Sequence, residues 1–263
     1  MQPNILPLPS IINPRDLGGL RGYQGRKIKS HRLLRTGDLS RITEQDKKFL
    51  SNYGLVKIID LRSRSEENEH PDPVIKGVEN ISLPLSKENG TLGDTSNLGD
   101  ADELYHSSLT AASQMMYDHY RKHVIEEFDQ KTVAQVLQIL AKTKNGAVIY
   151  HCTEGKDRTG FVNFFVLYIL GVDLETIRQD YLASSFILNK YRAVRDKKFE
   201  EAGENLIFRS NMRVLSSASD TLFDTILVTI EENFNGIENY LRNQLGVTAE
   251  LRQELRELYL END

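Results

Sequence analysis

The sequence predicts an α/β protein with a central, mainly parallel sheet flanked by helices and a helical C-terminal part. Two short apolar, β-branched runs, residues 56–60 and Ala147–His151, are typical of buried strands. Segments with helical periodicity lie between and after these runs, an alternation that favours parallel strands. The 263 residues are 39% hydrophobic, which is enough to form a sizeable core.

The first expected helix covers residues 43–53, because Thr43 can cap its start and Gly54 can end it. A further strand is expected over residues 81–85. Residues 86–102 are rich in Gly, Asn, Asp and Ser, so a surface loop is expected there. The helices expected after this loop cover residues 111–128, 131–142, 159–170, 222–234 and 248–260.

No repeat or linker divides the chain, so one domain is expected over residues 1–263. Recognisable motifs fall within residues 11–185, and residues 186–263 form a helical extension that could act as a lid. If the two main strands are neighbours, Asp60 and Cys152 face the same crevice, because ligands bind beyond the carboxyl ends of parallel strands.

Composition limits the partners and the compartment. A formal net charge of −5 argues against nucleic acid as a partner. With one cysteine, no intramolecular disulfide can form. No apolar run is long enough for stable membrane insertion, and the N-terminus does not resemble a secretory signal. A cytoplasmic location is therefore expected, with unconventional secretion as an alternative; the oligomeric state is not indicated.

The segment from His151 to Gly160, HCTEGKDRTG, is the strongest feature of the sequence. Five residues separate Cys152 from Arg158, between an expected strand and an expected helix. A loop of this length can turn its backbone amides into a common hollow that binds a phosphoryl group, aided by the helix N-terminus. The residues expected to form this hollow are Thr153, Glu154, Gly155, Lys156 and Thr159.

This arrangement predicts nucleophilic chemistry. The amides and Arg158 favour the thiolate of Cys152, and the fork of Arg158 can hold two phosphate oxygens. Thr159 can donate a hydrogen bond to the sulfur when it leaves, and His151 is expected to orient the loop. No metal or cofactor is required. The alternative reading, a buried core cysteine, does not explain the accompanying residues.

The Cys152-x5-Arg158-Thr159 loop resembles the protein tyrosine phosphatase superfamily, and its HCTEGKDRTG form resembles the PtpB-like group of bacterial tyrosine phosphatases that also accept phosphoinositides. Residues 13–19 (NPRDLGG), 34–39 (LRTGDL) and 59–63 (IDLRS) are similar to further motifs of that group, in the same order. Pro14 stands where the group usually has an aromatic residue.

The resemblance implies a phosphate monoester hydrolase acting on phosphotyrosine proteins and on phosphoinositides, or preferring the lipids, through a cysteinyl-phosphate. Asp60 is favoured as proton donor, with Asp157 as the alternative acid or as the residue that places the attacking water. Lys156 could attract a second phosphate or be exposed to solvent. Arg15, Arg35 and Arg62 could line the rim or form structural ion pairs. A sulfurtransferase and an inactive phosphate-binding module are the rival interpretations.

Overall fold

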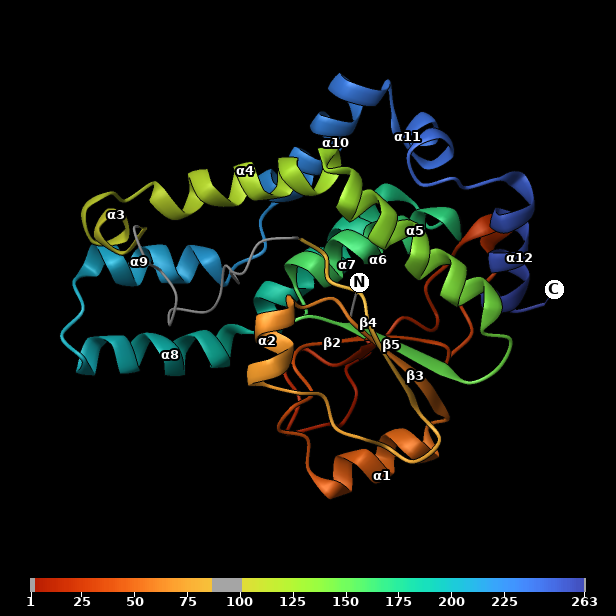
Figure 1. Ribbon diagram of the computed structural model, residues 1–263, viewed down its shortest axis with the longest axis horizontal. Helices are drawn as coiled ribbons and strands as arrows, with labels where there is room; N and C mark the ends of the chain where they lie inside the picture. The colour runs from red at the N-terminus through yellow and green to blue at the C-terminus, as the bar shows by residue number, and fades with distance from the viewer. Residues whose placement is uncertain (1–2, 87–100, 263) are drawn as a thin grey trace.

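A computed structural model describes residues 3–86 and 101–262. Its centre is a five-stranded sheet with the order β1-β2-β5-β3-β4 (Figure 1). All neighbouring strands are parallel except β1 and β2. The predicted α/β class with a mainly parallel sheet is confirmed. The strands are β1 (Arg15–Asp16), β2 (Leu33–Thr36), β3 (Leu55–Asp60), β4 (Glu79–Ser82) and β5 (Ala147–His151).

Helices flank the sheet, and a short 3₁₀ turn (Tyr23–Gly25) precedes β2. The helices are α1 (Glu44–Asn52), α2 (Arg64–Glu69), α3 (Ala101–Ser107), α4 (Ala111–Ile125), α5 (Glu127–Lys142), α6 (Asp157–Ile169), α7 (Leu174–Ile187), α8 (Asn189–Glu201), α9 (Leu206–Leu215), α10 (Asp220–Phe234), α11 (Ile237–Asn243) and α12 (Ala249–Tyr259).

Several expected boundaries were wrong. The break between α4 and α5 falls at Glu126, a single extended residue, rather than near residue 130. Strand β4 occupies residues 79–82 and not 81–85. Strands β1 and β2 and helix α2 were not predicted. Most of the expected loop over residues 86–102 lies outside the described residues, and α3 already begins at its end.

The strands alternate their side chains between two apolar layers. Leu33, Ile59 and Tyr150 point into the larger core, which the helices on the α5 and α6 side cover (Figure 1). Leu34, Ile58 and Ile149 point to the opposite face, where the smaller core packs against α1. This period of two places β3 and β5 between helical layers and explains why both strands are almost continuously apolar.

The parallel register brings strand ends together. Asp60 at the end of β3 pairs with His151 at the end of β5, and Thr36 at the end of β2 pairs with His151 from the other side. Cys152 follows immediately. The expectation that Asp60 and the cysteine loop lie at the same edge of the sheet is confirmed.

Helices α3, α4, α8 and α9 extend away from the sheet on one side of the molecule (Figure 1). Helix α9 lies against α3 and α4, and α8 packs along α9. Among the residues that the structure describes, no helix combines the length and apolar character needed to span a bilayer.

Candidate active site

The loop after β5 is held from outside through its carbonyl groups. The Thr153 carbonyl accepts a hydrogen bond of 3.0 Å from the amide of Asp38. The side-chain amide of Asn13 donates to the carbonyls of Glu154 and Gly155, at 3.1 and 2.9 Å. Three successive carbonyls are therefore bonded to residues outside the loop, which leaves the loop amides available to an anion.

The amides of residues 153–158 have no hydrogen-bond partner within residues 3–86 and 101–262. They lead into α6, whose positive N-terminal end adds to an anion-binding site. Gly155 adopts a left-handed φ of 65°, and a Cβ there would lie 2.3 Å from the Thr36 carbonyl oxygen. Only glycine fits this close approach, so the bend depends on the residue type.

Cys152, which follows the last residue of β5, is 3% exposed and forms no disulfide. Thr159, the third residue of α6, is fully buried, and its hydroxyl has no hydrogen-bond partner among the described residues. A buried hydroxyl without a partner is costly, which fits the predicted role of Thr159 in donating to a transient anion.

Glu66 on α2 was not predicted as a site residue, yet it holds Arg158. Its carboxylate accepts hydrogen bonds of 2.7 and 2.9 Å from the two terminal nitrogens of the guanidinium, and one of 2.5 Å from the Thr153 hydroxyl. Burial raises the pKa of Glu66, but the hydrogen bonds and charge of Arg158 outweigh this and lower it to about 2. The carboxylate is therefore charged near neutral pH, and its two hydrogen bonds hold the guanidinium of Arg158 in one orientation.

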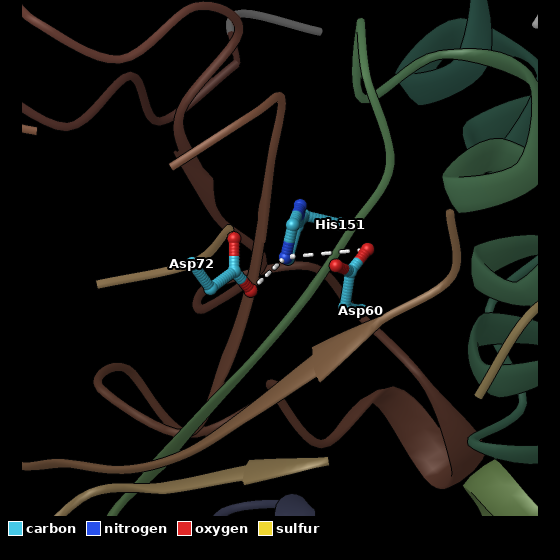
Figure 2. Close-up of side chains that lie close together, drawn as sticks. All are labelled: Asp60, Asp72 and His151. Atoms are coloured by element: carbon cyan, nitrogen blue, oxygen red, sulfur yellow. Dashed lines mark hydrogen bonds and ion pairs between the residues drawn. The ribbon is translucent and has the colours of Figure 1, made fainter. Parts of the chain in front are cut away.

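His151 lies between two carboxylates at the end of β5 (Figure 2). Its Nε2 is 2.7 Å from Asp72 and 3.7 Å from Asp60. Burial lowers the pKa of His151, but Asp60 and Asp72 outweigh this and raise it to about 9. A protonated imidazole does not accept a proton, which agrees with an orienting role.

The polar atoms of Asp60, Asp72 and His151 lie within 4.8 Å of one another, a spacing that could hold a metal ion. The guanidinium of Arg62 already occupies this cluster: it bonds Asp60 at 2.8 Å, Asp72 at 2.9 Å and Asp38 at 2.9 Å. Arg62 and protonated His151 thus supply the positive charge that a metal would bring, and the residues do not fit a cation site.

This cluster also fixes the state of Asp60. Burial raises its pKa, but the charge of His151 and the bonds from Arg62 outweigh that effect and lower it. A carboxyl group with a lowered pKa carries no proton near neutral pH. Arg62 is itself only 1% exposed, so its rim interpretation was wrong and the structural one is confirmed.

Asp157, the first residue of α6, has different surroundings. Its Oδ1 lies 2.7 Å from the Tyr120 hydroxyl, and its Oδ2 lies 3.3 Å from the Lys156 ammonium. Burial raises the pKa of Asp157 and outweighs the opposing effects of Lys156 and Tyr120. Of the two candidate acids, Asp157 is the one whose environment favours the protonated form.

Lys156 is fully buried, so its solvent-exposed interpretation was wrong. Its ammonium donates to the Leu215 carbonyl at the end of α9 and lies 3.5 Å from Glu154. The carboxylate of Glu154 in turn bonds Arg195 of α8 at 3.0 Å and Ser216 at 2.9 Å. The side chains of these two loop residues therefore tie the loop to α8 and to the end of α9.

Arg15 and Arg35 are also buried, at 1% and 0% exposure, and share Asp180 of α7 at 2.8 and 2.5 Å. Arg35 additionally donates to the Gly155 carbonyl at 2.9 Å. The interpretation that these two arginines line the rim of the site was wrong. They are structural ion pairs, with Asp180 rather than the aspartates near them in sequence.

Sequence reasoning missed Glu66, Asp180, Tyr120 and the supporting role of Asn13. Only Glu66 left a local signal: Ser63 and Glu66 have capping-box spacing, and the box is present, with the Ser63 amide donating to Glu66 at 2.9 Å. Asp180 and Tyr120 act across long sequence separations and belong to no local pattern. Asn13 begins the motif of residues 13–19, but the carbonyls that it binds lie 141 and 142 residues away.

A parallel sheet whose central strand leads into a Cys-x5-Arg loop at a helix N-terminus is an arrangement typical of cysteine-dependent phosphatases. The model of the tyrosine phosphatase family matches residues 6–261, so the chain belongs to that family. The resemblance stated from the motifs is confirmed, and the chain is a hydrolase of this family.

Three relatives can be aligned with this chain over most of its length. The triple specificity protein phosphatase PtpB of Mycobacterium tuberculosis is 27% identical over 261 residues, covering 90% of this chain and 92% of the relative. A Cupriavidus necator protein, provisionally named a tyrosine-protein phosphatase, is 26% identical over 249 residues, covering 94% and 86%. A tyrosine-protein phosphatase of Nostoc commune is 27% identical over 239 residues, covering 87% and 74%.

Among solved structures, TpbA of P. aeruginosa is 15% identical with a TM-score of 0.34, covering 78% of this chain and 89% of that one. This TM-score is too low for a detailed comparison of the two folds.

Proposed function

We propose that the protein hydrolyses phosphotyrosine in proteins by in-line attack of the Cys152 thiolate, through a cysteinyl-phosphate intermediate. The observation that carries the proposal is the loop itself, whose carbonyls of residues 153–155 are bonded outward and whose amides are left for an anion. Donors fixed in advance around a phosphoryl group stabilise the charge that develops in the transition state.

Arg158 is the side-chain partner of the phosphoryl oxygens in this scheme. Two of its five donors are engaged by Glu66. Because Glu66 binds one side of the guanidinium, the remaining donors are oriented before substrate arrives. Thr159, whose hydroxyl has no partner within the described part of the chain, donates to the sulfur when the cysteinyl-phosphate is hydrolysed.

We assign the proton donor to Asp157 rather than to Asp60, which the sequence favoured. The pKa of Asp157 is raised, chiefly by burial, whereas that of Asp60 is lowered by His151 and Arg62. A general acid must hold its proton at the working pH. In the second step, the resulting Asp157 carboxylate can accept a proton from the attacking water.

Phosphoinositides are the second substrate class. The GKDRTG form of the loop and the name of the mycobacterial relative, a triple specificity phosphatase, support activity beyond phosphotyrosine. The position of Lys156 does not add to this support, because its ammonium is buried against Leu215 and Asp157. Phosphotyrosine is therefore the primary proposal.

The test measures phosphate release from a phosphotyrosine peptide and from a short-chain phosphoinositide, with EDTA present and Cys152→Ser as the blank. Turnover of the peptide that disappears in Cys152→Ser supports the proposal. Turnover of the lipid alone would make the protein a lipid phosphatase. Release that survives Cys152→Ser, or no release from either substrate, would overturn the mechanism.

A further inference from the structure

The hydroxyls of two tyrosines form a hydrogen-bonded series that reaches the carboxyl group of Asp157. The Tyr120 hydroxyl of α4 lies 2.7 Å from Asp157 Oδ1 and 2.7 Å from the Tyr181 hydroxyl of α7. Both tyrosines are buried, at 0% and 2% exposure, whereas the Asp157 side chain keeps 15% of its surface accessible. The two tyrosines therefore approach the carboxyl group from the protein interior, and the buried Lys156 ammonium lies 3.3 Å from its other oxygen, Oδ2.

Proton counting fixes the direction of this series when Asp157 is ionised. A carboxylate only accepts hydrogen bonds, so Tyr120 must donate its one proton to Asp157. The Tyr120 oxygen is then free to accept a hydrogen bond from the Tyr181 hydroxyl. Every donor in the series points toward the carboxylate.

The packing around Tyr181 is specific to this arrangement. A Cβ at Gly160 of α6 would lie 3.0 Å from the Tyr181 ring, so glycine lets α7 bring this tyrosine close to the start of α6. The Tyr120 and Tyr181 rings meet edge to face at 6.4 Å. The two rings thus have little freedom to move their hydroxyls away from Asp157.

We propose that Tyr120, supported by Tyr181, is a positioning residue for the proton donor Asp157: its hydroxyl binds Oδ1 and thereby holds the carboxyl group in place at the start of α6. This proposal rests on the assignment of Asp157 as the acid. When the P–O bond breaks, the Asp157 carboxyl proton passes to the leaving oxygen, and the carboxylate formed is held by the Tyr120 donor. No other reactant is needed.

The pKa of Asp157 depends on Tyr120 together with the charged groups that face its carboxyl group. Lys156 stabilises the carboxylate from the Oδ2 side, and Glu154 opposes it through like charge. Tyr120 is the neutral donor on the Oδ1 side. Removing it takes away one bond to the ionised form, so the pKa of Asp157 rises further in Tyr120→Phe.

The experiment is the pH profile of kcat/KM on an alkyl phosphate, whose poor leaving group depends on the acid, and on an aryl phosphate with an acidic phenol. For Tyr120→Phe we expect the alkaline limb to move to higher pH. We also expect the rate on the alkyl ester to fall about tenfold, the effect of one charge-assisted hydrogen bond, with a smaller loss on the aryl ester. Tyr181→Phe should give a weaker change in the same direction.

Tyr240→Phe is the matched control, because Tyr240 is a fully buried tyrosine whose hydroxyl bonds α4 at the Val124 carbonyl, at 2.9 Å. It should leave the limb unchanged. If Asp157→Asn loses the alkaline limb of the pH profile but Tyr120→Phe leaves that limb unchanged, the role of Tyr120 is overturned and the acid assignment stands. A limb that persists in Asp157→Asn would overturn the acid assignment and this proposal together.

A double variant separates positioning from a general loss of packing. If Tyr120 acts through Asp157, Tyr120→Phe should change the rate little in the Asp157→Asn background, because coupled residues are not additive. A further tenfold loss in that background would contradict the proposal.

Discussion

The terminal nitrogens of Arg158 and the carboxylate oxygens of Glu66 form two parallel hydrogen bonds, of 2.7 and 2.9 Å. The same carboxylate accepts from the Ser63 amide that starts α2 and from the Thr153 hydroxyl in the loop. One side chain therefore connects a helix cap, the phosphate loop and the arginine that grips the phosphate.

Replacing Glu66 by Gln should lower kcat/KM about tenfold, because Arg158 loses one of two charge-assisted bonds that orient it. Steady-state kinetics on a phosphotyrosine peptide measures the effect. Glu67→Gln is the control: Glu67 lies next in the same helix but bonds Arg64 and Ser82 on the outer side. Equal losses in both variants would show that the effect comes from the helix and not from Arg158.

The ion pair between Glu66 and Arg158 should make the free energy of unfolding depend on pH in the acidic range. The pKa of Glu66 is lowered from 4.5 to about 2, so its contribution is complete above about pH 4.5 and is lost as the pH falls through about 2. The difference in unfolding free energy between the parent protein and Glu66→Gln should therefore shrink steadily from pH 5 toward pH 2. Urea unfolding across this range measures it. A difference that does not change with pH would contradict the pairing.

Gly155→Ala should reduce kcat/KM about a hundredfold, since a Cβ facing the Thr36 carbonyl must displace the loop by a fraction of an ångström or more. Gly203→Ala is the matched control, with a similarly positive φ of 84° but no atom within 4 Å of the added Cβ. If the two variants lose activity equally, the close approach at Gly155 is not what shapes the loop.

Asp180→Ala should destabilise the protein by about 3–5 kcal/mol, because it leaves two buried arginines without their shared partner. Activity should fall as well in the fraction that stays folded, since Arg35 also holds the Gly155 carbonyl. Chemical denaturation measures the stability, and vanadate affinity reports on the loop. A loss below about 1 kcal/mol, as for an exposed pair, would contradict the burial of this network.

The central strands and the loop could be predicted because their signals are local. The runs ending at Asp60 and His151 are apolar enough to predict buried strands. Only five residues separate Cys152 from Arg158, so their spacing can be recognised within one short segment of the sequence. Strand β2 was missed because its four residues, LLRT, are too few to show a period. The break at Glu126 was missed because no Gly or Pro marks it.

The partners of the charged residues could not be predicted, because they depend on which elements the fold brings together. Asp180 lies 145 residues from Arg35 and 165 from Arg15. Tyr120 lies 37 residues from Asp157, on a helix whose face becomes clear only in the packed structure. Of the three partners of Arg62, Asp72 is the one that follows α2 and belongs to no recognisable motif.

The most direct test of the covalent mechanism is intact-protein mass spectrometry of acid-quenched enzyme during turnover of a phosphotyrosine peptide. We expect a species heavier by one phosphoryl group, with the modification on the peptide that contains Cys152. Cys152→Ser, which removes the thiolate, should show no such turnover-dependent species. Phosphate release with no phosphorylated enzyme at any quench time, or a phosphoryl group on another residue, would contradict it.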